Sequence, residues 1–237
     1  MYFTDIQKEK RMNALKFLTA FMVVALFTAC ADDSGSSSSV LQESNEGILE
    51  PCKTESEDNC VYGSLTDSRD NRSYKTVKIG NQVWMAENLN VKTANSYCYN
   101  DSAEYCEKYG RLYEWAAAME ACPMGWHLPS KEEWHALFTA VGDSSSANLG
   151  LKSTSGWVDN LNGSDSYGFS MLPGGFRDVG GVFVNEKRVT FFWSSADNDD
   201  TFAYYMNFVS TSSSKLNDPS VKLDYKNESF SVRCVKD

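Results

Sequence analysis

Histidine is scarce in this chain, and the short motifs of common hydrolases are missing. Only two histidines occur, His127 and His135, and neither has a recognisable partner for a catalytic triad. The patterns G-x-S-x-G and H-E-x-x-H do not occur either. His127 lies in a Trp-His-Leu-Pro turn and His135 lies beside an apolar stripe, which favours a packing or surface role for both. The sequence therefore predicts a protein without a catalytic centre.

Basic residues are too few for a protein that binds nucleic acid. The chain carries 22 basic and 32 acidic residues, a formal net charge of −10. Residues 1–29 hold four basic and two acidic residues, so the remainder carries −12. Binding to a phosphate backbone depends on Lys and Arg side chains that displace counterions. This charge balance argues against nucleic acid as a partner.

No apolar run is long enough to cross a membrane as a helix. The run Phe17–Phe27 has eleven residues, whereas a bilayer core needs about 20. Basic residues precede it, and Thr28-Ala29-Cys30 follows. This order is typical of a lipoprotein signal peptide, residues 1–29, with lipid attached to Cys30; an ordinary secretory signal with a chance cysteine is the alternative. We expect a lipid-anchored protein of the cell envelope, at the outer membrane or cell surface.

Apolar residues stay sparse directly after Cys30. Residues 31–39 are small, acidic or serine, and few apolar side chains follow before Glu50. Such a composition cannot bury enough surface to order itself. We therefore expect residues 30–50 to form a flexible tether and residues 51–237 to form one globular domain.

Cysteine, in contrast, is plentiful after Cys30. Six cysteines remain, and an even number in an exported protein predicts disulfides, with 15 possible connectivities. Cys52–Cys60 and Cys98–Cys106 are both C-x7-C, a spacing that suits small local loops. The remaining pair, Cys122–Cys234, would tie the middle of the domain to its last strand. Zinc binding is the alternative, but C-x2-C pairs and Cys/His clusters are absent.

The segment that follows the first cysteines predicts a hairpin and then a helix. Residues 74–88 contain two β-rich runs around Gly80-Asn81, a dipeptide that suits a two-residue turn. A first helix is predicted by apolar residues at helical spacing: Leu112, Trp115, Ala116 and Met119.

A second helix has a clear start and end, and short strands follow it. Ser130 and Glu133 form a capping box, and Gly142 ends the helix. Its apolar stripe consists of Trp134, Leu137, Phe138 and Val141. Candidate strands are residues 168–172, 181–184, 190–194, 203–209 and 230–235. Two helices followed by a mostly antiparallel sheet predict an α+β domain.

Long stretches of the chain resemble the fibrobacter major paralogous domain family, which is related to C-type-lectin-like folds. The matching stretches are DSRDNRSYKTVKIGNQVWMAENLN (67–90), YCYNDSAEYCEKYGRLYEWAAAMEACPMGWHLPSKEEW (97–134), LKSTSGW (151–157), GFSMLPGGFRD (168–178), FFWSSA (191–196) and SVRCVKD (231–237). The segment GWHLPSKEEW is also similar to one in formylglycine-generating-enzyme-like domains.

The resemblance implies a C-type-lectin-like domain with two helices, a short-stranded sheet and long loops over one face. In that fold a cysteine near a helix is joined to one on the final strand, which agrees with the pair Cys122–Cys234. Family members are typically exported, and carbohydrate attachment is suspected for them. This chain has Trp-Ser-Ser at Trp193–Ser195 and lacks the lectin tripeptides E-P-N, Q-P-D and W-N-D, so their calcium-dependent mechanism is not transferred.

Sugar binding is the function that the second half of the domain favours. Aromatic rings stack on the C–H faces of sugars, while Asp, Asn and sometimes Ca²⁺ bind the hydroxyl groups. The candidate ligand-binding residues are Trp157, Tyr204, Tyr205, Asp197, Asn198 and Asp199. The candidate calcium ligands are Asp159, Asn162 and Asp165. In the alternative interpretation, the aromatic residues belong to the core and the Asp-Asn runs are turns.

Two functions of different classes follow from these observations. The first is a non-catalytic surface module that binds polysaccharide. The second is a structural or protein-interaction scaffold of the envelope, with envelope proteins as partners. A small hydrolase or oxidase is a third alternative. An exposed aromatic row would favour the first function, and a broad apolar patch without such a row would favour the second.

Overall fold

Two sheets and four α-helices make up the part of the chain that the structure describes. The computed structural model describes residues 47–210 and 220–237, so the predicted signal peptide, the lipidation site Cys30 and most of the predicted tether lie outside the described residues. The strands are β1 (Tyr62–Thr66), β2 (Ser73–Ile79), β3 (Gln82–Met85), β4 (Ser96–Tyr97), β5 (Leu112–Glu114), β6 (Trp126–His127), β7 (Phe176–Arg177), β8 (Phe183–Val184), β9 (Val189–Asp197), β10 (Phe202–Val209), β11 (Ser220–Tyr225), β12 (Ser229–Ser231) and β13 (Val235–Lys236). The helices are α2 (Ala103–Tyr109), α3 (Trp115–Met119), α4 (Lys131–Ala140) and α5 (Ser144–Leu151), and two 3₁₀ turns are η1 (Tyr99–Asp101) and η2 (Val158–Asn160).

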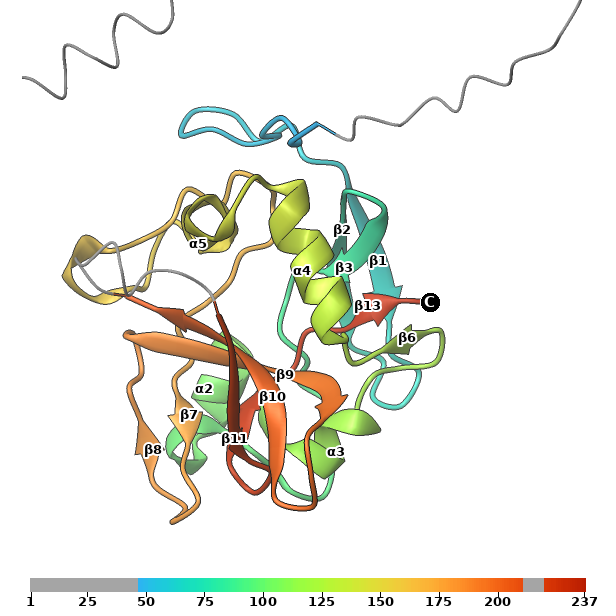
Figure 1. The fold of residues 1–237 in the computed structure, drawn as a ribbon, viewed down its shortest axis with the longest axis vertical. Helices are drawn as coiled ribbons and strands as arrows, with labels where there is room; N and C mark the ends of the chain where they lie inside the picture. Colours follow the sequence, from blue (N-terminus) through green and yellow to red (C-terminus); the bar gives the residue numbers. More distant parts are fainter. Residues whose placement is uncertain (1–46, 211–219) are drawn as a thin grey trace, which may run out of the picture. The chain divides into compact units, whose positions relative to one another are not determined.

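The smaller sheet has five strands in the order β1-β2-β3-β13-β6, all paired antiparallel. The predicted hairpin is confirmed as β2 and β3. The two strands are joined at Gly80, whose φ of +59° is a left-handed conformation that glycine adopts easily because it has no β-carbon. The last strand, β13, pairs with β3 and β6, so the first and last strands of the domain belong to the same sheet (Figure 1).

The larger sheet has the strand order β11-β10-β9-β12-β5-β4, with the β7–β8 hairpin attached to β12. Its pairs are antiparallel except β9 and β12, which run parallel where Ser231 faces Phe192. Strand β11 pairs only with β10 among the described strands and therefore forms one edge of this sheet. The mostly antiparallel α+β prediction is confirmed at this level.

Helix α4 contributes to the larger of two hydrophobic cores. The predicted capping box is present, because the Ser130 hydroxyl accepts from the Glu133 N–H (3.1 Å) and the Glu133 carboxylate accepts from the Ser130 N–H (2.8 Å). Figure 1 shows α4 between strands β2–β3 and strands β9–β10. Its buried side chains pack there with residues of both sheets, among them Trp84, Phe192, Met206 and Phe208.

The predicted first helix is wrong over its first turn. Residues Leu112–Glu114 form β5, which pairs with β4 and β12, and only Trp115–Met119 is helical. Cross-strand partners far away in the sequence override the helical spacing here. Sequence reasoning also missed α2 and α5, although the Asp143 carboxylate caps α5 by accepting from the Ser146 N–H (2.7 Å).

Two predicted strands also differ from the structure. Residues 168–172 form no strand; Met171 makes one isolated bridge to Lys152, while the carbonyl groups of Phe169 and Ser170 accept from the guanidinium of Arg233. Residues 230–235 divide into β12 and β13, because the segment Val232–Cys234 between them leaves one sheet and joins the other.

All three expected disulfides are present. They join Cys52 to Cys60, Cys98 to Cys106, and Cys122 to Cys234, the last over a separation of 112 residues. The packed part of the domain begins slightly before residue 51, where it was expected to start. The Leu49 N–H donates to the Ala140 carbonyl in α4 (2.9 Å), and the Leu49 side chain packs on the core. No helix within residues 47–210 and 220–237 is long and apolar enough to cross a membrane.

Candidate functional site

Two of the three aromatic residues expected to bind sugar are buried. Trp157 is 5% exposed, and its indole N–H donates to the Ser153 hydroxyl (3.1 Å). Tyr205 is 7% exposed and packs in the core with Phe191, Trp193 and Phe230. Neither ring offers a face to a ligand, so the expectation for Trp157 and Tyr205 is corrected: both are core residues.

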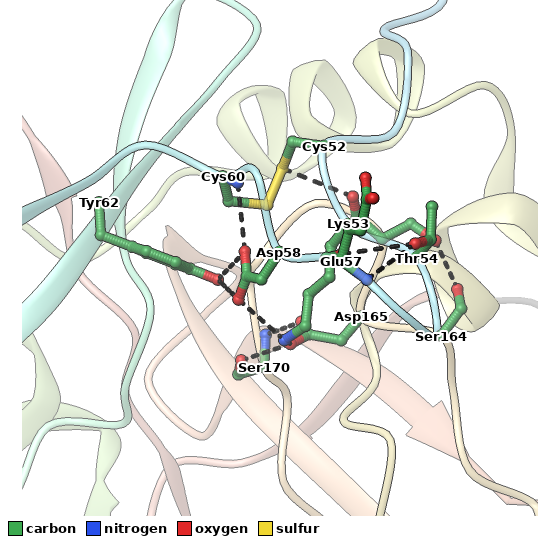
Figure 2. The surroundings of a disulfide bond; sticks show 11 residues. Cys52, Lys53, Thr54, Glu57, Asp58, Cys60, Tyr62, Ser164, Asp165 and Ser170 are labelled. Atoms are coloured by element: carbon green, nitrogen blue, oxygen red, sulfur yellow. Dashed lines mark hydrogen bonds and ion pairs between the residues drawn. A yellow bond between two sulfur atoms is a disulfide. The ribbon is translucent and has the colours of Figure 1, made fainter.

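The expected calcium ligands do not form a site. Asp165 is buried, and its carboxylate binds the Lys53 ammonium (2.7 Å) together with the hydroxyl (2.8 Å) and N–H (2.6 Å) of Ser170 (Figure 2). The side-chain oxygen of Asn162 accepts from the Trp157 N–H (3.1 Å), and Asp159 is an exposed residue of η2. In the described part of the chain, no three Asp, Glu, His or Cys side chains are placed to hold a metal ion. The calcium expectation at these three residues is therefore wrong.

The acidic cluster at 197–200 closes the β9–β10 hairpin. The carboxylate of Asp199 accepts from the N–H groups of Thr201 and Phe202 (both 2.8 Å), and these bonds lower the pKa of Asp199. Asp197 forms an ion pair with Lys226 (2.7 Å). Asn198 joins this turn to strand β10, because its side-chain oxygen accepts from the Tyr204 hydroxyl (3.2 Å).

Tyr204 remains partly accessible, and it belongs to a group of side chains on one face of β10 and β11. Residues directly opposite each other in antiparallel strands share a face, and so do alternate residues of one strand. Tyr204 lies opposite Leu223, and Phe202 lies opposite Tyr225. We call this surface the β10–β11 platform; it consists of Phe202, Tyr204, Val221, Leu223 and Tyr225.

The platform combines open aromatic and aliphatic surface. Val221, Leu223 and Tyr225 are 43%, 45% and 45% exposed, and the rings of Phe202 and Tyr225 lie 4.6 Å apart between centroids. Sequence reasoning missed Phe202 and Tyr225. The signal that could have found Tyr225 is the alternation of apolar residues at 221, 223 and 225, since alternate positions share one face of a strand. Phe202 joins this face only through the pairing of β10 with β11.

Polar groups border the platform beside Tyr204. The Lys131 ammonium lies 3.9 Å from the centroid of the Tyr204 ring, and the Asn198 amide contacts the Tyr204 hydroxyl. Lys131 covers one face of Tyr204, so Tyr225 is the more open of these two rings. Open rings beside hydrogen-bonding amide and ammonium groups are the combination that suits a sugar, whose rings have both C–H faces and hydroxyl groups.

His127 lies between two carboxylates, as a structural histidine would. One ring nitrogen is 2.6 Å from Asp237 and the other is 2.8 Å from Glu133. Partial burial lowers the pKa of His127, but the hydrogen bonds to Asp237 and Glu133 outweigh it and raise this pKa overall. The contacts link β6 to the start of α4 and to the end of the described chain.

A polar cleft of about 300 Å³ lies elsewhere on the domain, between the Cys52–Cys60 loop, strand β2, the segment 86–90 that follows β3, and helix α2. It is lined by side chains of both charges, including Lys53, Lys75, Glu87, Glu107 and Lys108. Its walls come from segments far apart in the chain, and the sequence did not predict it.

The fold and these surfaces define a class: an α+β domain, stapled by three disulfides, with an aromatic platform on an edge of its larger sheet and a polar cleft. The chain belongs to the family described as the Fibrobacter succinogenes major domain, whose model matches residues 77–236. The resemblance on which the family expectation was based is thereby confirmed. No curated protein and no solved structure matches the chain.

Proposed function

We propose that this protein is a non-catalytic binding module that holds polysaccharide at the surface of the cell envelope. The β10–β11 platform carries this proposal, because the exposed ring of Tyr225 packs against the half-buried ring of Phe202, with centroids 4.6 Å apart. An exposed ring such as that of Tyr225 can stack on the C–H face of a sugar unit, while Lys131 and Asn198 offer hydrogen bonds to hydroxyl groups. An exposed aromatic ring bordered by polar side chains is the feature expected of a sugar-binding surface.

The proposal includes a lipid anchor on Cys30 and the envelope location that follows from it. The support is the order of basic residues, short apolar run and Thr28-Ala29-Cys30 in the sequence. The intact mass of the membrane-extracted protein tests it. Cleavage at another residue, or an unmodified Cys30, would contradict the anchor.

We also propose that the fold is C-type-lectin-like, without the calcium mechanism of sugar-binding lectins. Supporting features are the disulfide from Cys122, just after α3, to Cys234, just before β13, and the shared sheet of β1 and β13. Because the oxygens of Asp165 and Asn162 already have protein partners, we propose that binding requires no metal ion.

The test is retention of the full-length, detergent-extracted protein on insoluble polysaccharides, with calcium or with EDTA. We expect retention on at least one glycan, equal in both buffers. Tyr225→Ala should weaken it about two- to tenfold, the range of one aromatic contact. Val61→Ala, which changes an exposed apolar residue outside the platform, is the matched control and should bind normally. Retention that Tyr225→Ala leaves intact, or no retention on any glycan, would overturn the platform as a sugar site.

A second candidate function is an envelope scaffold that binds proteins. The observation in its favour is the aliphatic part of the platform, Val221 and Leu223, on the edge strand β11. Exposed apolar edge strands are common sites of protein contact. The test is crosslinking in intact cells from a photoreactive residue at position 223. Capture of one envelope protein, together with no retention on any glycan, would favour this function.

A further inference from the structure

Strand β11 has one side that no other strand covers. Within residues 47–210 and 220–237 it pairs with β10 alone, and with 6 residues it is longer than the other edge strands, β1, β4, β6 and β8. The N–H and C=O groups on the free side of an edge strand can pair with a strand of another chain. The edge at β11 is therefore a candidate site of strand addition.

The free side of β11 presents the backbone groups of its odd-numbered residues. The Lys226 N–H donates to the Thr201 carbonyl (2.9 Å), one step beyond the pair Tyr225–Phe202. Because hydrogen-bonded and non-hydrogen-bonded pairs alternate along antiparallel strands, the backbone groups of residues 220, 222 and 224 point to β10 and those of 221, 223 and 225 point away from it. The Tyr225 N–H accordingly donates to the Asp224 carboxylate (2.9 Å) and not to β10.

Two charged side chains of β11, Lys222 and Asp224, lie on the sheet face opposite the platform. Their neighbours across β10 are the buried residues Tyr205 and Ala203. Neither Lys222 nor Asp224 takes part in an ion pair within the described residues. Glu228 lies near Asp224, since the charge of Asp224 contributes to the raised pKa of Glu228. An added strand that brings a cation to Asp224 would therefore meet two carboxyl groups.

These features fit a second copy of the same strand. Two antiparallel copies of β11 can exchange backbone hydrogen bonds only where odd-numbered residues face odd-numbered residues, because those groups point outward. When Leu223 faces Leu223 of the second copy, Val221 faces Tyr225 and Lys222 faces Asp224, twice each by symmetry. The registers centred on Lys222 or on Asp224 place equal charges directly opposite each other, and their repulsion disfavours both registers.

The register centred on Leu223 also supplies partners that the single strand lacks. The Lys222–Asp224 contact falls on a non-hydrogen-bonded pair, where side chains of neighbouring strands come closest. The Tyr225 N–H gains the Val221 carbonyl of the second copy as acceptor, which releases the Asp224 carboxylate for Lys222. Charges on the inward face of an edge strand normally discourage strand addition, but here each added strand brings the opposite charge.

We propose that two copies of this protein pair through β11 and form a symmetric dimer with one continuous sheet. The two-fold axis is perpendicular to the sheet at Leu223, so the platforms of both copies lie on the same face. The dimer does not rest on sugar binding, because its contacts are the edge of β11 and the charged face behind the platform.

The first test is analytical ultracentrifugation of the full-length protein in density-matched detergent, over a range of protein concentrations. We expect a monomer–dimer equilibrium. Lys222→Asp and Asp224→Lys should each weaken it at least about tenfold, because each substitution turns two attractive contacts into two repulsive ones. An equimolar mixture of the two variants should dimerise like the natural protein, because every facing pair then has opposite charges again.

Lys78→Asp is the matched control, because it makes the same charge change at an exposed lysine of β2, which lies between β1 and β3. It should leave the equilibrium unchanged. A natural protein that stays monomeric at every concentration, an equal loss from Lys78→Asp, or a mixture that does not recover dimerisation would overturn the proposal.

A second test measures the register in the otherwise natural protein. Facing residues of a hydrogen-bonded pair have Cα atoms about 5.5 Å apart, a separation that a disulfide can span. Leu223→Cys should therefore form a disulfide-linked dimer under mild oxidation, whereas Val61→Cys, at an exposed residue outside β11, should not. Equal crosslinking of the two variants, or none at position 223, would contradict the pairing. Neither test involves a glycan, so their failure would leave polysaccharide retention through the platform untouched.

Discussion

The ammonium of Lys53 lies 2.7 Å from the buried carboxylate of Asp165, 112 residues further along the chain. The same carboxylate binds Ser170, and the backbone N–H groups of Cys52 and Lys53 donate to the Ser166 carbonyl (2.9 Å and 3.1 Å). These bonds attach the disulfide-closed loop 52–60 to the segment that follows η2 (Figure 2). Asp165, which the sequence suggested as a calcium ligand, thus holds two distant parts of the domain together.

Asp165→Asn should destabilise the domain by about 3 kcal/mol, because it leaves Lys53 without its buried partner. Asp159→Asn, a nearby exposed carboxylate, should change the free energy of unfolding by less than about 0.5 kcal/mol. Chemical denaturation of both variants measures this difference. Equal stability of the two variants would show that the Lys53–Asp165 contact contributes little.

The long-range disulfide should contribute more to stability than the two disulfides that close short loops. Replacing Cys122 and Cys234 by alanine should cost about 5 kcal/mol, because the bond closes a loop of 112 residues in the unfolded chain. Replacing Cys52 and Cys60 should cost about 2.5 kcal/mol for a separation of 8 residues. Thermal unfolding of both double variants tests this order. A larger loss from the Cys52–Cys60 pair would mean that contacts of the loop, and not chain entropy, dominate.

His127 should make stability depend on pH in the neutral range. Its pKa is raised in the folded state, so protonation stabilises the fold below about pH 6.5, and this contribution is lost as the pH rises through the folded-state pKa. In mild acid, the free energy of unfolding of His127→Gln should therefore be up to about 1 kcal/mol lower than that of the natural protein, and at alkaline pH the two should be similar. The difference stays small because the ring is partly exposed.

The measurement is the unfolding free energy of both proteins at about pH 5.5 and about pH 8.5, with the imidazole signal of His127 followed by NMR. His135→Gln, a change at an exposed histidine, should not reproduce the acid-specific loss. A His127 variant whose deficit is the same at both pH values would refute the role assigned to protonation.

Glu228 should have the same sign of pH dependence for a different reason. Burial raises the pKa of Glu228 to about 7, the charges of Asp224 and Asp178 add to this effect, and one of its carboxylate oxygens has no hydrogen-bond partner. The contribution of the protonated Glu228 carboxyl to the free energy of unfolding is fully present below about pH 4.5 and is lost as the pH rises to about 7.

Glu228→Gln removes the ionised form and should stabilise the protein by about 1–3 kcal/mol above pH 7, with no gain below about pH 4.5. Unfolding curves across this range measure it. Glu55→Gln, at an exposed glutamate, is the control for a simple change in net charge. A gain of equal size in the control, or none at alkaline pH, would exclude the buried carboxylate as the cause.

Several features follow from residues that are close in the sequence. Ser130 and Glu133 are three positions apart, so their reciprocal cap depends on little beyond the first turn of α4. The turn at Gly80 and the short cysteine loops are equally local, and the family resemblance depends on contiguous stretches of sequence. Such signals are readable because the interacting groups occupy neighbouring positions.

Other features depend on residues that approach each other only in the folded domain. Leu112 follows a helical spacing, but the strand partners β4 and β12 hold it in β5. Trp157 and Tyr205 resemble ligand-binding aromatics in the sequence, but packing against distant residues buries them. Aromatic character alone does not separate core from surface, because burial depends on the neighbours that the fold supplies.

The β10–β11 platform and the polar cleft are the clearest case of this difference. The local sequence accounts for the hairpin, the cap of α4, the cysteine spacing and the predicted anchor at Cys30. The platform needs β11 to pair with β10, and the cleft needs loop 52–60, β2, the segment 86–90 and α2 to come together. Long-range pairing and burial bring these groups together, and their energies depend on contacts that no local pattern encodes.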